Sequence, residues 1–83
     1  MFTVYVLFSE KFNKIYIGMT GNIEERLKSH NELSKKGWTK NFRPWVIVHS
    51  ETFDLKSKAL TREKQLKSAS GRGFIWDLIK NQG

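Results

Sequence analysis

The segment from Ile15 to His30 joins a short strand to a helix through a glycine-containing turn, and it restricts the fold more than any other part of the sequence. Ile15-Tyr16-Ile17 has the aromatic and β-branched side chains that suit a half-buried strand. Gly18 and Gly21 then mark a turn, and the threonine and the asparagine on either side of Gly21 are both candidate helix caps. The segment therefore predicts a strand, a tight turn and a helix in immediate succession.

Two basic side chains of this helix are expected on one face. Arg26 and His30 are four residues apart, so they lie one above the other in a helix. The preceding strand presents the phenol of Tyr16 near them, and a phenol, a guanidinium and an imidazole together suit phosphate chemistry. The alternative is that Arg26 forms a surface ion pair with Glu24 or Glu25 and that His30 is an ordinary polar residue.

Hydrophobic periodicity and turn residues divide the rest of the chain into further strands and helices. The order ββαβαα predicts an α+β fold in which a small antiparallel three-stranded sheet is flanked by helices. We expect residues 1–83 to form a single domain, because a chain of this length has room for one core. The expected strands cover residues 2–8, 15–19 and 45–53, and the expected helices cover residues 22–35, 55–69 and 74–81.

Several finer expectations follow from local composition. The strand at 45–53 is the most hydrophobic stretch, which predicts the centre of the sheet. Residues 38–43 are expected to form a loop, and Asp54 is a candidate cap for the second helix. Lys36-Gly37 should end the first helix, and Ser70-Gly71-Arg72-Gly73 should separate the last two. Ile23 and Leu27 should face the core.

The net charge favours a polyanionic partner. The chain has 15 Lys and Arg against 8 Asp and Glu, a formal charge of +7, so nucleic acid is the first candidate and a merely soluble basic protein is the alternative. Cysteine is absent, which excludes disulfides and thiolate metal sites and favours a cytoplasmic setting. No apolar run approaches the ~18 residues of a membrane span, so no membrane partner is expected.

Residues 35–43 interleave cations with aromatic side chains. Such cations would meet backbone phosphates, and an unstacked base could lie on Trp38 or Phe42. The alternative is that both aromatic side chains anchor the core and only the lysines meet solvent. The candidate nucleic-acid contacts are Lys35, Lys36, Trp38, Lys40, Arg43 and Lys67.

Taken in order, these residues resemble the GIY-YIG endonuclease superfamily over essentially the whole chain. Thr3-Val4-Tyr5 stands where that family has Gly-Ile-Tyr, although only the tyrosine is kept, and Tyr16-Ile17-Gly18 is the second tripeptide unchanged. Arg26 and His30 stand at the helix arginine and at the histidine that often follows one turn later. The chain is similar to small stand-alone, excinuclease-like members, which consist of little more than the catalytic domain.

The resemblance also implies a metal site in the second helix. The segment from Ala59 to Lys67 is similar to the one that holds the family's metal-binding glutamate, here Glu63. One carboxylate suits Mg²⁺, or Mn²⁺, whose remaining ligands are waters and substrate phosphate. The alternative for Glu63 is an i,i+4 ion pair with Lys67. Several members also carry an asparagine late in the domain, and this sequence offers only Asn81 there, too near the end of the last helix to be assigned to that role.

The activity implied by the resemblance is metal-dependent endonucleolytic hydrolysis of DNA, one strand at a time, including structure-selective cleavage in repair or recombination. Tyr5 would take the proton of the attacking water, and Tyr16 would position water or phosphate. The implied catalytic set is Tyr5, Tyr16, Arg26, His30 and Glu63. From the residues alone, either tyrosine could instead be a core residue. The alternatives to an enzyme are a non-catalytic nucleic-acid-binding module and a module that recruits a repair partner.

Many relatives carry a separate DNA-binding domain, and a chain of this length has no room for one. Substrate selectivity is therefore expected from the basic face, from a homodimer or from a protein partner.

Overall fold

The computed structural model of the protein describes residues 1–33 and 38–81, and it confirms the predicted α+β fold with a three-stranded antiparallel sheet. The described residues form the strands β1 (Phe2–Ser9), β2 (Lys14–Thr20) and β3 (Val46–Phe53) and the helices α1 (Ile23–Lys28), α2 (Lys56–Lys67) and α3 (Ala69–Asn81). A π-helical turn, η1 (Ser29–Leu33), follows α1, and a 3₁₀ turn, η2 (Trp38–Phe42), precedes β3.

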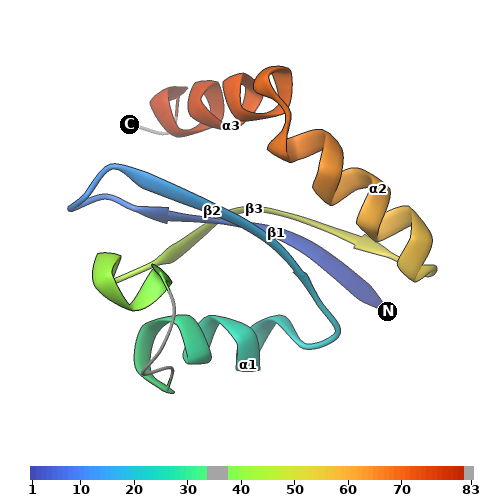
Figure 1. Ribbon diagram of the computed structural model, residues 1–83, viewed down its shortest axis with the longest axis horizontal. Helices are drawn as coiled ribbons and strands as arrows, with labels where there is room; N and C mark the ends of the chain where they lie inside the picture. Colours follow the sequence, from blue (N-terminus) through green and yellow to red (C-terminus); the bar gives the residue numbers. More distant parts are fainter. Residues whose placement is uncertain (34–37, 82–83) are drawn as a thin grey trace.

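The helices cover the two faces of the sheet, with α1 on one side and α2 and α3 on the other (Figure 1). Because side chains alternate along a strand, β1 serves both faces. Val4 and Val6 lie in the core under α2 and α3, together with Ala59, Leu66 and Ile75. Tyr5, Leu7 and Trp45 form a second cluster on the other face, against which Ile23 and Leu27 pack as predicted.

The predicted position of the third strand is wrong. The strand order is β2-β1-β3, so β1 lies at the centre and β3 is an edge strand. Val4, Val6 and Leu7 of β1 are fully buried, whereas Val46 and Ile47 of β3 are 53% and 40% exposed. The hydrophobicity of β3 therefore does not measure its burial, because two of its apolar side chains face solvent.

A tight turn joins β1 and β2, as expected. Asn13 has a φ of 54°, a left-handed conformation that asparagine tolerates better than most residues. Its backbone N–H donates to the carbonyl of Glu10 at 3.3 Å, which closes the turn.

The first helix differs from the prediction of one continuous helix over 22–35. Asn22 is its cap, since its side chain accepts from the backbone N–H of Glu25 at 3.1 Å. The α-helical hydrogen bonding gives way to the π turn at Ser29, a change that hydrophobic spacing does not reveal. The predicted end at Lys36-Gly37 lies outside the described residues.

The expected loop at 38–43 is mostly the 3₁₀ turn η2.

Two expectations for the C-terminal helices are also wrong. Leu55 occupies the N-cap position of α2 without a side-chain cap, while Asp54 pairs with Lys58 at 3.7 Å. The segment Ser70–Gly73 lies inside α3 rather than between helices. A Cβ at Gly71 would collide with the backbone of Gln65 and Leu66, so this glycine allows the two helices to meet closely at their corner.

No helix in the described ranges is long and apolar enough to cross a membrane.

Candidate active site

The two tripeptides of the hairpin bring Tyr5 and Tyr16 together over a glycine. The register of β1 and β2 places Tyr5 directly opposite Gly18. A Cβ at Gly18 would lie 2.6 Å from the Tyr5 hydroxyl oxygen and 3.1 Å from the Cε1 atom of Tyr16. Glycine is therefore required here by the close approach of two aromatic rings, whose centroids are 6.2 Å apart.

The Tyr5 hydroxyl forms hydrogen bonds with both basic side chains of the helical segment, Arg26 and His30. Its Oη lies 3.0 Å from Nε2 of His30, and Nε of Arg26 donates to it at 3.4 Å. Since a guanidinium only donates, the Tyr5 proton can point at His30. The predicted proximity of Tyr5, Tyr16, Arg26 and His30 is thus observed, with the Tyr16 ring 4.7 Å from the imidazole.

Burial keeps the imidazole of His30 neutral. His30 is 5% exposed, and this burial, followed by the nearby charges of Arg26 and Arg43, lowers its pKa below the ordinary value of 6.5. With Nε2 accepting from Tyr5, the proton of the neutral ring is on Nδ1. Nδ1 lies 3.0 Å from Oγ1 of Thr39, which accepts that proton's hydrogen bond.

Burial also keeps Tyr5 protonated at neutral pH. It raises the pKa of the phenol above the ordinary value of 10, and the hydrogen bond from Arg26 offsets this only in part. Tyr5 is therefore a hydroxyl that donates to His30 and accepts from Arg26, rather than a resting phenolate. Such a group can pass a proton only when a neighbouring base takes its own.

Arg26 connects this buried relay to the surface. Its side chain is exposed and helps to line an open groove of about 250 Å³, whose other lining residues are Thr20, Asn22, Glu25 and Ser29. Among the described residues, neither Glu24 nor Glu25 forms an ion pair with Arg26, contrary to the surface-pair alternative. The guanidinium charge is thus available to an anion in the groove.

Glu63 approaches the site from α2, on the other side of the hairpin. Its side chain is 20% exposed and its carboxylate lies 3.6 Å from the ammonium of Lys67, so the ion pair expected as an alternative is present. Its negative charge nevertheless contributes to the raised pKa of Tyr5. Glu63 therefore lies within electrostatic range of the hydroxyl without touching it.

The donor set fits a loosely held divalent ion. Among the described residues, no group of three or more His, Asp or Glu side chains has the arrangement of a metal cage. Glu63 provides a half-buried carboxylate near Tyr5. An ion with one protein oxygen and otherwise water and phosphate ligands matches the preference of Mg²⁺.

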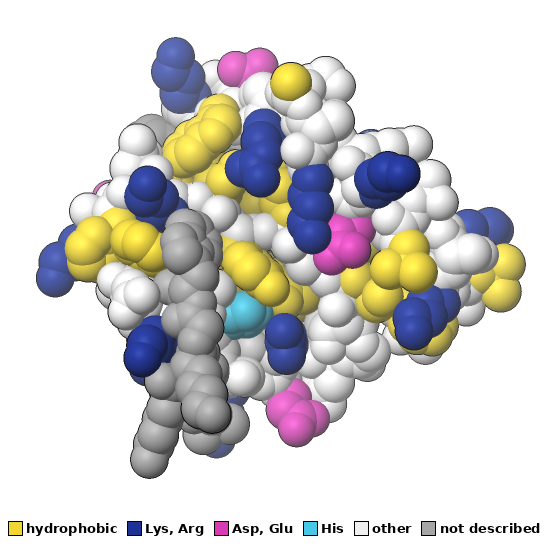
Figure 2. All heavy atoms as spheres, viewed as in Figure 1, with side chains coloured by type: hydrophobic (Ala, Val, Ile, Leu, Met, Phe, Trp, Pro, Cys, Tyr) yellow, Lys and Arg dark blue, Asp and Glu magenta, His cyan; other side chains and the backbone are white. Residues whose placement is uncertain are grey.

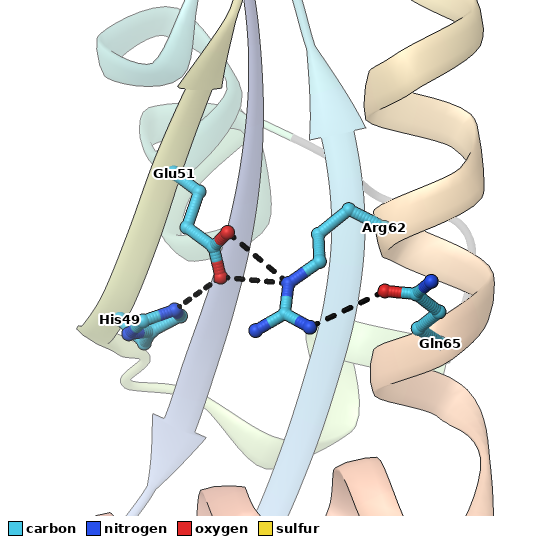
Figure 3. Close-up of polar contacts among 4 residues, drawn as sticks. All are labelled: His49, Glu51, Arg62 and Gln65. Atoms are coloured by element: carbon cyan, nitrogen blue, oxygen red, sulfur yellow. Dashed lines mark hydrogen bonds and ion pairs between the residues drawn. The ribbon is translucent and has the colours of Figure 1, made fainter.

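A separate polar network positions the helix that carries Glu63 (Figure 3). Nε of Arg62 donates to both carboxylate oxygens of Glu51 on β3, at 2.9 and 3.1 Å, and Nη1 donates to Gln65 at 3.3 Å. His49 contacts the same carboxylate at 2.7 Å. Burial would raise the pKa of Glu51, but the hydrogen bonds from His49 and Arg62 outweigh it and hold that pKa low. The network is a tie between β3 and α2.

The structure describes the side chains of three of the six candidate nucleic-acid contacts. Lys35, Lys36 and the side chain of Trp38 lie outside what the structure describes. Lys40 is exposed, and Lys67 is half-exposed beside Glu63. Arg43 instead supports the site, since its Nε donates to the backbone carbonyl of His30 at 2.6 Å.

Two site residues were not found from the sequence. Thr39 holds Nδ1 of His30, and Asn31 holds the π turn by accepting from the Trp45 N–H at 2.6 Å and donating to its carbonyl at 2.9 Å. The Trp45 indole donates in turn to the carbonyl of Thr39 at 2.8 Å. No periodicity links these positions to His30, because they meet only through the folding of η1 and η2.

Comparison with known proteins identifies the family of this chain. The family model of the GIY-YIG catalytic domain matches residues 1–75 of the sequence. A UPF0213 protein of Syntrophus aciditrophicus is 45% identical over 79 residues, which are 92% of this chain and 88% of that protein. A UPF0213 protein of Staphylococcus haemolyticus is 42% identical over 60 residues, 72% of this chain and 73% of that protein. One from Natronomonas pharaonis is 40% identical over 67 residues, 81% and 78% respectively.

Proposed function

The chain belongs to the GIY-YIG catalytic-domain family, which is of nuclease type, and from this premise we propose that it is a divalent-metal-dependent endonuclease that hydrolyses DNA one strand at a time. One observation carries the proposal: an exposed arginine at a groove shares a buried tyrosine hydroxyl with a neutral histidine. Residues 1–83 act in this proposal as one catalytic domain.

Arg26 binds the scissile phosphate. Its charge lies at the groove without a carboxylate partner among the described residues, and its fork of donors matches two phosphate oxygens. Negative charge grows on those oxygens as hydrolysis proceeds, so the guanidinium stabilises the transition state more than the ground state.

Tyr5 and His30 move the proton of the attacking water. As water attacks phosphorus, its proton passes to Oη of Tyr5 while the Tyr5 proton passes to Nε2 of His30. The charge balance leaves an imidazolium at His30 and a neutral phenol at Tyr5, so no free phenolate forms. The hydrogen bond from Nδ1 to Thr39 fixes the ring for this transfer. Tyr16, whose ring lies 4.7 Å from the imidazole, positions water or phosphate in this proposal.

Glu63 would hold the divalent ion, together with water and substrate oxygens. A bound Mg²⁺ or Mn²⁺ supplies charge stabilisation at the leaving oxygen. The ion pair with Lys67 is weak, because the lysine side chain is 49% exposed and its ammonium lies 3.6 Å from the carboxylate, and it would yield to a divalent cation. We propose DNA repair or recombination in the cytoplasm as the setting.

A second function, DNA binding without chemistry, is favoured by the raised pKa of Tyr5 and by the Lys67 partner of Glu63. The test is incubation of the protein with plain, nicked, flapped and branched DNA in Mg²⁺, Mn²⁺ or chelator. The endonuclease proposal requires strand cleavage that chelator abolishes. Binding with cleavage no greater than background would favour the second function.

A further inference from the structure

A cluster of aromatic and basic side chains lies at the tip of the β1–β2 hairpin, outside the catalytic set. We call it the hairpin-tip patch, and it consists of Lys11, Phe12, Lys14 and Phe42. Phe12 is 40% exposed, so this large apolar side chain at the tip of the turn contributes little to the core. Its ring meets that of Phe42 edge to face, with centroids 5.4 Å apart and planes at 79°.

The patch is held by the fold. Phe12 precedes the left-handed Asn13 of the closed turn, and Phe42 packs on the cluster of Tyr5, Leu7 and Trp45. The exposed ring of Phe12 therefore packs against the ring of Phe42, which is itself held by the core beside the active site. A ring held in this way loses little conformational freedom when a flat partner stacks on it.

The patch and the catalytic groups lie on the same face of the sheet. Gly18, Tyr16 and Lys14 alternate along β2 and so point to one side. Lys14 extends this row to the tip, where its ammonium lies 5.8 Å from the centre of the Phe42 ring. The patch thus continues the row of β2 positions that begins at Gly18, beside the Tyr5 hydroxyl.

Charge at the tip also suits a nucleic acid. The segment from Glu10 to Lys14 contains two lysines and one acid. The ammonium of Lys11 lies 5.5 Å from the centre of the Phe12 ring, close enough to reach a phosphate beside a stacked base. Figure 2 shows hydrophobic side chains between cations at the left of the view, where Figure 1 draws the end of the hairpin.

The spacing along the strand sets the scale of the contact. Ser9 lies four residue steps after Tyr5 along β1, which at ~3.3 Å per step is about 13 Å. The turn adds a few ångströms, so Phe12 lies roughly 15–20 Å from the hydroxyl. At 3.4 Å per nucleotide step, this distance is about five nucleotides.

We propose that the hairpin-tip patch binds an unpaired base of the substrate by stacking on Phe12, while Lys11 and Lys14 contact the adjacent phosphates. This inference rests on the proposed endonuclease function and names its substrate class: DNA with a gap, flap or frayed end about five nucleotides from the cut. Stacking tolerates any base, so the patch selects structure rather than sequence.

The test compares gapped and fully paired DNA, bound by wild type and variants in chelator so that no cleavage occurs. Phe12→Ala should weaken binding to gapped DNA on the order of tenfold, as expected for one lost stacking contact, and leave duplex binding unchanged. Lys14→Gln should reduce the salt slope by about one. Phe74→Ala is the matched control, because Phe74 is 42% exposed but lies on α3 beside His49.

A second readout does not depend on a folded variant. A fluorescent adenine analogue placed in the gap should be quenched by wild-type protein when it lies about five nucleotides from the cut. Equal gapped-DNA binding by wild type and Phe12→Ala, or quenching that is independent of position, would overturn the patch while leaving the nuclease proposal intact. Dimerisation lost in Phe12→Ala at unchanged DNA affinity would also overturn it. Absence of any DNA binding would instead remove the proposed function itself.

Discussion

Two polar clusters on opposite faces of the sheet each contain one histidine and one arginine, yet their charges are arranged differently. On the face of α2, Arg62 and His49 both contact the carboxylate of Glu51. On the face of α1, Arg26 and His30 both contact the neutral hydroxyl of Tyr5. The comparison shows that residue types alone do not identify the site. What matters is whether the cationic charge is already compensated.

The α2-face cluster is electrostatically complete. Its carboxylate accepts from a charged guanidinium and an imidazole, so it needs no ligand. The α1-face cluster is incomplete in the same sense, since its arginine keeps a full charge beside an open groove. An anion such as phosphate would complete it. We therefore assign structure to the first cluster and phosphate chemistry to the second.

The largest difference between the clusters should appear when each arginine is replaced. Arg26→Ala should reduce the nicking rate by about 10²–10³, the effect of one lost transition-state donor, with little change in melting temperature. Arg62→Ala should lower the free energy of unfolding by about 1–2 kcal/mol, because Glu51 loses a charged partner. Nicking rates and melting curves of both variants check this. If Arg26→Ala and Arg62→Ala lost the same activity and had the same stability, the distinction between a catalytic and a structural arginine would be contradicted.

Glu63→Gln addresses the metal-holding carboxylate. Cleavage in Mg²⁺ should fall at least tenfold, because the amide keeps the shape but weakens the ligand proposed to hold the ion, while binding of DNA in chelator should stay within about twofold. Lys67→Gln is the matched control. It breaks the same ion pair at a cost of about 0.3–0.5 kcal/mol and should leave the Mg²⁺ dependence unchanged. Unchanged Mg²⁺ dependence in both variants, with a similar small loss of stability, would assign Glu63 to stability.

The smallest effect should be the acid response of the α2-face cluster. Because the folded-state pKa of Glu51 lies below its ordinary value of 4.5, its stabilisation is fully present above pH 4.5 and is lost as the pH falls through the folded-state pKa. Glu51→Gln should therefore cost about 1 kcal/mol at neutral pH and close to nothing in strong acid. Denaturant unfolding across that range measures the difference. A pH-independent cost would contradict it.

Local sequence patterns predicted the parts of the site that local structure builds. Gly18 and the spacing of Arg26 and His30 could be interpreted without knowing the rest of the fold. The contact between Tyr5 and His30 spans 25 residues and needed the family resemblance. The contact of Thr39 with the His30 imidazole could not be predicted, because the folding of η1 and η2, rather than a periodic element, brings the two residues together.

The errors in the fold have the same origin. The apolar composition of β3 predicts a central strand, but strand order depends on pairing partners, which hydrophobicity does not encode. Gly71 looked like a helix breaker, yet the close approach of α2 and α3 requires it inside α3. In both cases, tertiary contacts overrode a local preference.

The most direct test of the uncompensated arginine and its shared hydroxyl is the nicking rate of Tyr5→Phe against wild type, on gapped DNA in Mg²⁺. The substitution removes one oxygen atom and keeps the buried ring, but it leaves Nε2 of the buried His30 without its partner. The cost of about 1–3 kcal/mol should lower the melting temperature by roughly 4–20 °C, so the rates are compared well below the melting temperature of the variant. We predict a rate lower by at least 10², because neither the water nor His30 can then exchange a proton through Tyr5. Cleavage by Tyr5→Phe at the wild-type rate would contradict the account.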